Sequence, residues 1–142
     1  MHEAAARLNI QLVVLTANSE NDFDAAFARM AQQRAGGLLV CASFYSRHER
    51  LIALAAHHSL PAIYEWREIA AAGGLMSYGT SLPDAYQQAG TYAGRILKGA
   101  EPADLRAMQS TKFEFVINLR TAKTLGLDTP ANLLSFVDEV IE

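Results

Sequence analysis

Short apolar runs alternate with segments of helical periodicity, and this alternation constrains the fold more than any other feature of the chain. In the segment 22–34, Phe23, Phe27 and Met30 recur at helical spacing. Alternation of strands and helices with short links predicts an α/β fold with a mainly parallel sheet and helices on its faces. The expected strands of the first half are Ile10–Ala17, Gly37–Ala42, Leu60–Tyr64 and Gly74–Tyr78.

Two further helices are predicted from local signals. Ser46 with Glu49 three residues later matches a capping box, and it predicts a helix whose buried face holds Leu51, Ile52, Ala55 and Ala56. A longer helix is expected over 81–98, with Ser81 at its N-cap and Gly99 at its end. A strand over 112–118 and a helix over 119–125 follow.

Composition excludes several classes of protein. The chain has 142 residues, of which 51% are hydrophobic and 19% charged, as in a single globular domain. Its net charge is -3, whereas nucleic-acid-binding proteins typically carry an excess of basic residues. No apolar run approaches the roughly 18 residues of a membrane-spanning helix. The first ten residues lack a basic segment followed by an apolar one, so we do not interpret them as a signal peptide.

Polar and aromatic residues gather where three of the predicted strands end. Because ligands of parallel α/β sheets bind beyond the carboxyl ends of the strands, these residues form the candidate site. Aromatic residues at strand ends also serve packing alone, and the pattern leaves both interpretations open. The residues are Ser43, Phe44 and Tyr45 after the second strand, Glu65, Trp66 and Arg67 after the third, and Ser77 and Tyr78 in the fourth.

No pattern of catalytic or metal-ligating residues emerges. Cys41 lies in an apolar run with no base beside it, so we expect a small buried hydrophobic side chain. Ser43 lacks the G-x-S-x-G environment of hydrolases, and the glycine pairs lack nucleotide-binding spacing. His57 and His58 are adjacent, so they cannot chelate a metal as an i, i+4 pair would. The sequence therefore predicts no enzyme, no metal and no cofactor.

Three motifs, in order, carry a resemblance to a known family. They are GGLMSYG at 73–79, RILKGAEPADL at 95–105 and KFEFVINLRTAKTLGL at 112–127. With their surroundings they are similar to the C-terminal part of substrate-binding proteins of ATP-driven (ABC) uptake transporters, of the type I periplasmic-binding-protein fold. Some members resemble receptors for tryptophan and other aromatic amino acids. The resemblance extends from about residue 3 to residue 142.

The resemblance implies a two-lobed protein that holds a small solute between its lobes and delivers it to an ABC transporter permease on the periplasmic side of the membrane. Residues 1–80 would be the second lobe, 81–110 a crossover helix that packs on the first lobe, and 111–142 a returning strand with C-terminal helices. Members run to about twice this length, so we expect a truncated chain or fragment that lacks the first lobe.

Roles for the candidate site residues follow from this resemblance. The rings of Tyr45, Trp66 and Tyr78 would face an aromatic or branched amino acid. Ser43 and Ser77 would hydrogen-bond its polar end, beside Phe44. Arg67 would pair with its carboxylate. Related receptors often carry an acidic or amide residue near position 43, which is absent here, and Glu65 would replace it.

Two expectations follow from a missing lobe. Solute binding should be weak, because a cleft ligand buries most of its surface between two walls. The apolar stripe of the helix over 81–98 should be exposed, which predicts a homodimer. The alternative function is a stand-alone flavodoxin-like regulatory or nucleotide- or flavin-binding protein. The absence of a glycine in the segment TANSENDF at 16–23 counts against it.

Overall fold

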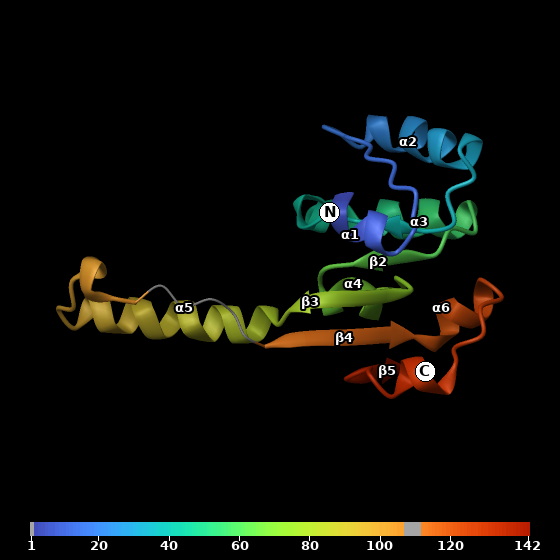
Figure 1. Ribbon diagram of the computed structural model, residues 1–142. Helices are drawn as coiled ribbons and strands as arrows, with labels where there is room; N and C mark the ends of the chain where they lie inside the picture. The colour runs from blue at the N-terminus through green and yellow to red at the C-terminus, as the bar shows by residue number, and fades with distance from the viewer. Residues whose placement is uncertain (1, 107–111) are drawn as a thin grey trace. The chain divides into compact units, whose positions relative to one another are not determined.

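The computed structural model describes residues 2–106 and 112–142. The chain divides into two compact units, Met1–Arg34 and Ala35–Glu142 (Figure 1). The division expected at 80/81 and 110/111 concerns the lobes of a longer protein and stays a prediction, and the second of those boundaries lies outside the described residues.

The first unit contains α1 (His2–Arg7) and α2 (Asn21–Gln32). The Asp22 carboxylate accepts hydrogen bonds from the backbone N–H groups of Asn18 and Ser19, at 2.8 and 2.9 Å. These donors stabilise the ionised carboxylate and lower the pKa of Asp22. The stripe predicted for this helix is confirmed, since its buried residues are Phe23, Phe27 and Met30.

The strand predicted at Ile10–Ala17 is wrong. Residues 10–17 have no regular secondary structure, and Val14 is 61% exposed. A strand exists only when its backbone groups pair with a neighbouring strand. Within the described part of this unit both other elements are helices, so the β-branched run has no partner there.

The second unit holds the sheet and most of the helices. In chain order its elements are β1 (Leu38–Leu39), the 3₁₀ helix η1 (Ala42–Arg47), α3 (His48–His57), β2 (Ala62–Tyr64), α4 (Arg67–Ala71), β3 (Met76–Thr80), α5 (Leu82–Leu97), the 3₁₀ helix η2 (Pro102–Asp104), β4 (Phe113–Asn118), α6 (Leu119–Thr124), α7 (Ala131–Leu134) and β5 (Glu139–Ile141).

The five strands form one sheet in the order β1-β2-β3-β4-β5. All neighbouring pairs are parallel except β3 and β4, which are antiparallel. The predicted α/β class with a mainly parallel sheet is therefore confirmed. Because β1, β2 and β3 run in the same direction, their carboxyl ends lie at the same edge of the sheet (Figure 1).

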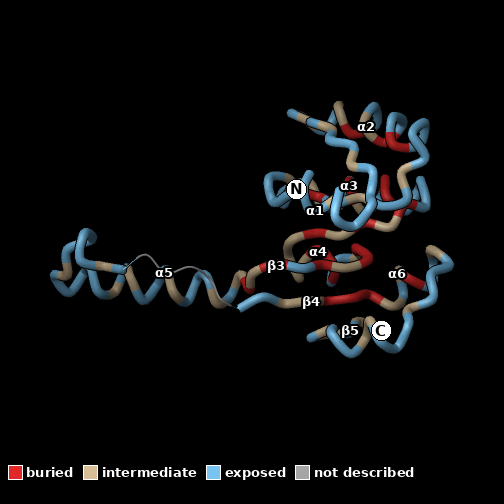
Figure 2. Tube along the Cα trace, in the orientation of Figure 1, coloured by how far each residue is buried: buried red, intermediate tan, exposed pale blue. Residues whose placement is uncertain are grey.

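The core of this unit is centred on β2, β3 and β4 (Figure 2). Tyr64, Ser77 and Val116 occupy successive positions across the three strands and are the largest of its fully buried side chains. The short helix α4 packs against the same strands. Asn118 links the two layers, because its Nδ2 donates to the carbonyl of Ala70 and its Oδ1 accepts from the backbone N–H of Thr121 at the start of α6.

Four local predictions on β1 and α3 are wrong. Gly37–Ala42 contributes only a two-residue strand because η1 begins at Ala42, and this early turn leaves Cys41 exposed. Arg47 is the N-cap of α3, and no capping-box hydrogen bond forms.

The buried face of α3 is also shifted from the predicted one. It consists of Leu51, Leu54 and Ala55, whereas Ile52 is only half-buried and Ala56 is exposed.

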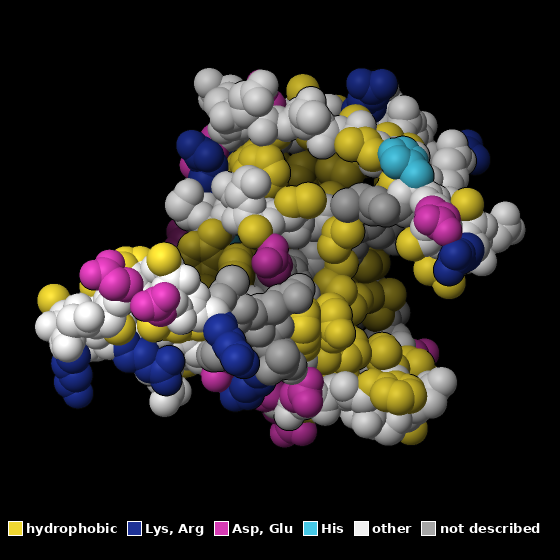
Figure 3. Space-filling model, turned by 60° about the vertical axis from the view of Figure 1, so that its left-hand side comes forward, with side chains coloured by type: hydrophobic (Ala, Val, Ile, Leu, Met, Phe, Trp, Pro, Cys, Tyr) yellow, Lys and Arg dark blue, Asp and Glu magenta, His cyan; other side chains and the backbone are white. Residues whose placement is uncertain are grey.

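Helix α5 is present as predicted, with Ser81 as its N-cap residue and Gly99 in the left-handed conformation after its end. It has no buried residue along its 16 positions, and Leu97 is 88% exposed. The ribbon shows it running away from the sheet beyond β3 and β4 (Figure 1). In the space-filling view, hydrophobic side chains lie at the surface among charged ones (Figure 3).

Candidate functional site

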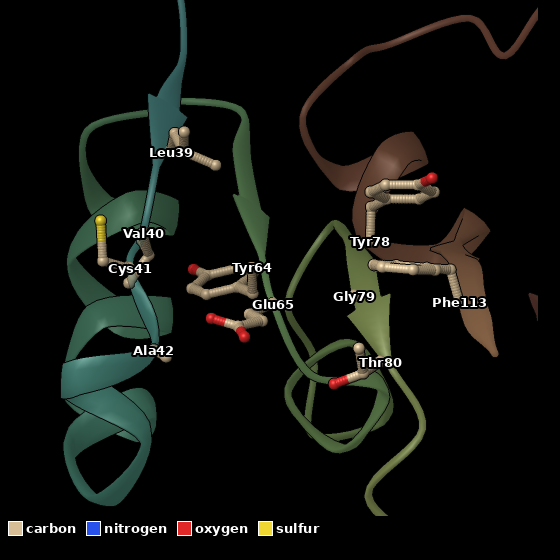
Figure 4. A pocket seen from close by; sticks show the side chains of 10 residues that line it. All are labelled: Leu39, Val40, Cys41, Ala42, Tyr64, Glu65, Tyr78, Gly79, Thr80 and Phe113. Atoms are coloured by element: carbon tan, nitrogen blue, oxygen red, sulfur yellow. The ribbon is translucent and has the colours of Figure 1, made fainter. Parts of the chain in front are cut away.

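A pocket of about 290 Å³ lies within the second unit, where β1 and β2 end. Its walls come from the ends of β1 and β2, the second half of β3 and the first residue of β4, so the sheet topology itself assembles it. The lining residues are Leu39, Val40, Cys41, Ala42, Tyr64, Glu65, Tyr78, Gly79, Thr80 and Phe113 (Figure 4).

Two polar side chains from the end of β2 enter this pocket. Figure 4 shows the Glu65 carboxylate and the Tyr64 hydroxyl between β1 and β3. Among the described residues, neither group has a hydrogen-bond or ion-pair partner. Tyr64 is only 1% exposed, and its burial raises the pKa of its phenol to about 12. The hydroxyl is thus a neutral hydrogen-bonding group in the pocket, beside the Glu65 carboxylate.

Gly79 sets the distance between β2 and β3 at the pocket. A Cβ atom at this position would lie 2.1 Å from the Glu65 carbonyl oxygen and 2.9 Å from Glu65 Cγ. Glycine is thus required here by the close approach of the neighbouring backbone. The same approach holds the Glu65 side chain at the edge of β3.

An aromatic wall comes from the antiparallel pair β3 and β4. Their register places Tyr78 opposite Phe115 and Thr80 opposite Phe113. The rings of Tyr78 and Phe113 are stacked with centroids 5.8 Å apart, and that of Tyr78 meets Phe115 edge to face at 6.2 Å. Tyr78 and Phe113 line the pocket on the β4 side of β3 (Figure 4).

Other predicted site residues lie outside the pocket lining. Ser43, Phe44 and Tyr45 are in η1, directly after the lining residue Ala42. The Tyr45 ring meets Trp66 edge to face at a centroid distance of 6.3 Å, so the structure joins two of the predicted segments there.

Arg67 is engaged within the protein. Its Nε and Nη2 donate to the two carboxylate oxygens of Glu139 at 2.6 and 2.5 Å. This bidentate pair connects the first turn of α4 to β5 and raises the pKa of Arg67. The only guanidinium predicted for the site therefore already faces a carboxylate.

Ser77 lies in the core and is fully buried. Its Oγ has no hydrogen-bond partner among the described residues. Alternation along β3 explains this position, because side chains of successive strand residues point to opposite faces. Tyr78 therefore reaches the pocket while Ser77 faces Tyr64 and Val116 within the sheet.

The sequence analysis did not identify several lining residues. Tyr64 and Cys41 lie in apolar runs that are typical of buried strands. Cys41 is exposed only because β1 ends before it, at Leu39. Phe113 is 35 positions from Tyr78 in the chain, so only the strand register shows that the two rings meet. The alternating pattern FEFVIN was the single available signal that one face of β4 carries aromatic rings.

The described residues contain neither a metal-binding cluster nor a membrane-spanning helix. No cluster of three or more His, Cys, Asp or Glu side chains in the part of the chain covering 2–106 and 112–142 could hold a metal ion. No helix in these ranges has both the length and the apolar character needed to cross a membrane.

Comparison with protein families gives one match that spans the chain. The profile of the family described as ABC transporter substrate binding protein matches residues 1–141. A search of curated proteins gave no match.

Comparison with solved structures gives relatives of the same fold. A conserved domain protein from Vibrio cholerae O1 biovar El Tor superposes with a TM-score of 0.88 at 24% identity, covering 98% of this chain and 47% of that one. An ABC domain in complex with L-Trp from Streptococcus pneumoniae gives 0.86 at 20% identity, covering 98% and 49%. A ligand-free, open substrate binding protein with adhesive properties from Clostridium difficile gives 0.65 at 19%, covering 99% and 47%. The chain thus spans about half the length of the structures it matches.

Proposed function

Because the chain belongs to the ABC transporter substrate binding protein family, we propose that it is all or part of the solute-binding component of an ABC-type uptake transporter. The observation that carries the proposal is the family match over residues 1–141, together with a pocket at the carboxyl ends of β1 and β2. Sheets of this kind bind ligands at that edge. The role is binding and release, without catalysis.

The solute we propose is an amino acid with an aromatic or branched side chain. One solved structure of the same fold is in complex with L-Trp. In this chain, the rings of Tyr78 and Phe113 and the side chains of Leu39 and Val40 give the pocket apolar walls of the kind that enclose such side chains. Tyr45 and Trp66, which contact each other beyond the end of β2, would extend the aromatic surface at its rim.

The remaining predicted contacts take different roles in this proposal. Glu65 is the acidic contact for the solute, and Ser43 and Phe44 are contacts contributed by η1. Arg67 acts through its ion pair with Glu139, which fixes the start of α4 directly after Glu65 and Trp66. We assign Ser77 a core position because its side chain is inaccessible.

The chain acts, in this proposal, as one wall of a larger site. It spans about half of each matched structure, which supports a second lobe in 1–80, a crossover helix in 81–110 and a returning segment in 111–142. A permease on the periplasmic side would receive the solute. Isothermal titration calorimetry with tryptophan, phenylalanine and leucine tests the binding role.

The expected calorimetric result is binding weaker than micromolar, since a single wall buries only part of the solute. Sub-micromolar binding by a monomer would contradict the need for a second wall. The absence of binding by all three amino acids at millimolar concentration would contradict the binding role of this chain.

Self-association through α5 belongs to the same proposal. The exposed side chains of Tyr86, Ile96 and Leu97 on α5 would be covered by a second copy of the 142-residue chain. Light scattering after gel filtration measures the mass directly, and a monodisperse species of 15.5 kDa at tens of micromolar would refute the dimer. Substitution of both Ala89 and Ala93 by Glu should convert the dimer to monomer; an intact dimer would place the contact elsewhere.

A further inference from the structure

We propose that the pocket selects the protonated amine of its solute and that its lining in this chain offers no partner for a carboxylate, so that this chain binds an amine more tightly than a zwitterion or an anion of the same shape. The inference rests on the proposed solute-binding function and names the charge class that the pocket recognises. Three features of the second unit carry it: the unpaired Glu65 carboxylate, the engagement of Arg67 elsewhere, and the aromatic wall.

The first feature is the pair of polar groups without partners at the end of β2. Tyr64 is almost fully buried, yet its hydroxyl reaches the pocket and has no hydrogen-bond partner among the described residues. A hydroxyl that lines a cavity and forms no hydrogen bond with the described residues has its donor and acceptor positions open to a ligand. An ammonium group can donate to the Glu65 carboxylate and to the Tyr64 hydroxyl oxygen at once.

The second feature is the charge of the surroundings. None of the described lining residues is Lys or Arg, and Glu65 is the only carboxylate among them. Arg67, two positions after Glu65, is held by both oxygens of Glu139. A solute carboxylate placed beside Glu65 would meet a like charge without a cation to offset it, which disfavours anions.

The third feature is the aromatic lining on β3 and β4. The stacked rings of Tyr78 and Phe113 line the pocket, and aromatic rings attract cations as well as flat apolar groups. A solute with an ammonium group and an aromatic ring therefore finds a partner for each part. A neutral aromatic solute would contact only the apolar walls and would leave the Glu65 carboxylate without a partner.

Four compounds that share one ring and differ in charge test this inference. They are 2-phenylethylamine as the cation, phenylalanine as the zwitterion, 2-phenylethanol as the neutral compound and 3-phenylpropionate as the anion. Cys41 is the single cysteine of the chain, is exposed and lines the pocket, so a bound solute should slow its alkylation by iodoacetamide. The concentration that halves the alkylation rate gives the dissociation constant of each compound.

The expected order of affinity is amine first, with the zwitterion and the alcohol weaker and the anion weakest. Glu65→Gln should weaken binding of the amine by about tenfold, the effect of losing one charge-assisted hydrogen bond, and leave the alcohol unchanged. Tyr64→Phe keeps the buried ring and should weaken the amine by a smaller factor. Glu68→Gln is the matched control, because Glu68 lies outside the lining and should leave every affinity unchanged.

The outcomes separate the inference from the function on which it rests. Equal affinity for all four compounds, or an amine affinity that Glu65→Gln does not change, overturns the charge preference while solute binding stands. Failure of all four compounds to slow alkylation, while a maleimide adduct confirms that Cys41 is reactive, overturns the binding role itself. Because the compound series is measured on the unaltered chain, the test does not depend on the folding of any variant.

Discussion

Replacing Gly79 by alanine should destabilise the second unit through a single steric contact. The added Cβ would lie 2.1 Å from the Glu65 carbonyl oxygen, whereas real Cβ atoms essentially never approach closer than 3.0 Å. The obstructing atom belongs to the backbone of β2, so it cannot be relieved by a side-chain rotation. Either β2 and β3 separate by most of an ångström or the strand pairing breaks.

The magnitude follows from the cost of overpacking. Inserting a methyl group into a packed interior typically costs about 1–3 kcal/mol, and a backbone clash of this depth places Gly79→Ala at the upper end of that range. For a small domain with roughly 5–15 kcal/mol of total stability, the substitution would be easily detected. Urea denaturation followed by circular dichroism gives the change in the free energy of unfolding from the shift in midpoint.

The matched control is the same substitution on α5. No atom outside the helix lies within 4 Å of a Cβ built on Gly90, and Gly90 is in the interior of the helix. Gly90→Ala should therefore stabilise the helix by up to about 1 kcal/mol, since alanine is the better helix former. Equal effects of the two substitutions, or a Gly79→Ala midpoint unchanged from the parent, would show that the approach of β2 to β3 does not require glycine at position 79.

Two further predictions concern side chains that hold loops and helices in place. Asn118→Ala should destabilise the second unit by about 1–3 kcal/mol, because it leaves the Ala70 carbonyl and the Thr121 N–H without their buried partner; a urea midpoint within error of the parent would contradict this. Asp22→Asn should destabilise α2 at neutral pH. The folded pKa of Asp22 lies below its ordinary value of 3.8, so its contribution is present above that value and is lost as the pH falls through the folded pKa. Circular dichroism should show the difference between parent and variant shrinking in acid, and a difference independent of pH would rule out the carboxylate.

Local periodicity predicted the elements whose partners are close in the chain. The stripe of Phe23, Phe27 and Met30, the small-residue helix α5 and the aliphatic runs before Tyr64 and Tyr78 each carry their signal within a few residues. The class of the fold follows from their order. The end of α5 was equally predictable, because Gly99 readily adopts the positive φ that follows the helix.

The strands that were predicted wrongly or not predicted share a physical cause, because a strand depends on pairing with a neighbouring strand. The run at 10–17 has strand composition but no neighbouring strand among the described residues of its unit, and β5 is a three-residue strand that exists only through its pairing with β4. The capping box predicted at Ser46 does not form because Ser46 belongs to the 3₁₀ helix η1. This helix continues to Arg47, so α3 begins only at His48.

The candidate site was predictable by region but not by residue. The carboxyl ends of β1 and β2 were identified from the strand order, and Glu65 and Tyr78 do line the pocket. Which other residues line the pocket depends on where each strand ends and on which face each side chain lies. Because β3 continues to Thr80, Ser77 is an interior residue of that strand rather than its end. The ion pair of Arg67 with Glu139 joins positions 72 residues apart, which no local pattern could show.

Amide chemical-shift mapping of the ¹⁵N-labelled chain during titration with L-tryptophan shows whether solute binds in the pocket at the ends of β1 and β2. We predict saturable shifts concentrated at Leu39–Ala42, Glu65 and Tyr78–Thr80, with little change along α5. Shifts that concentrate on α5 instead, or that are absent at the pocket while binding is seen elsewhere, would contradict solute binding in this pocket.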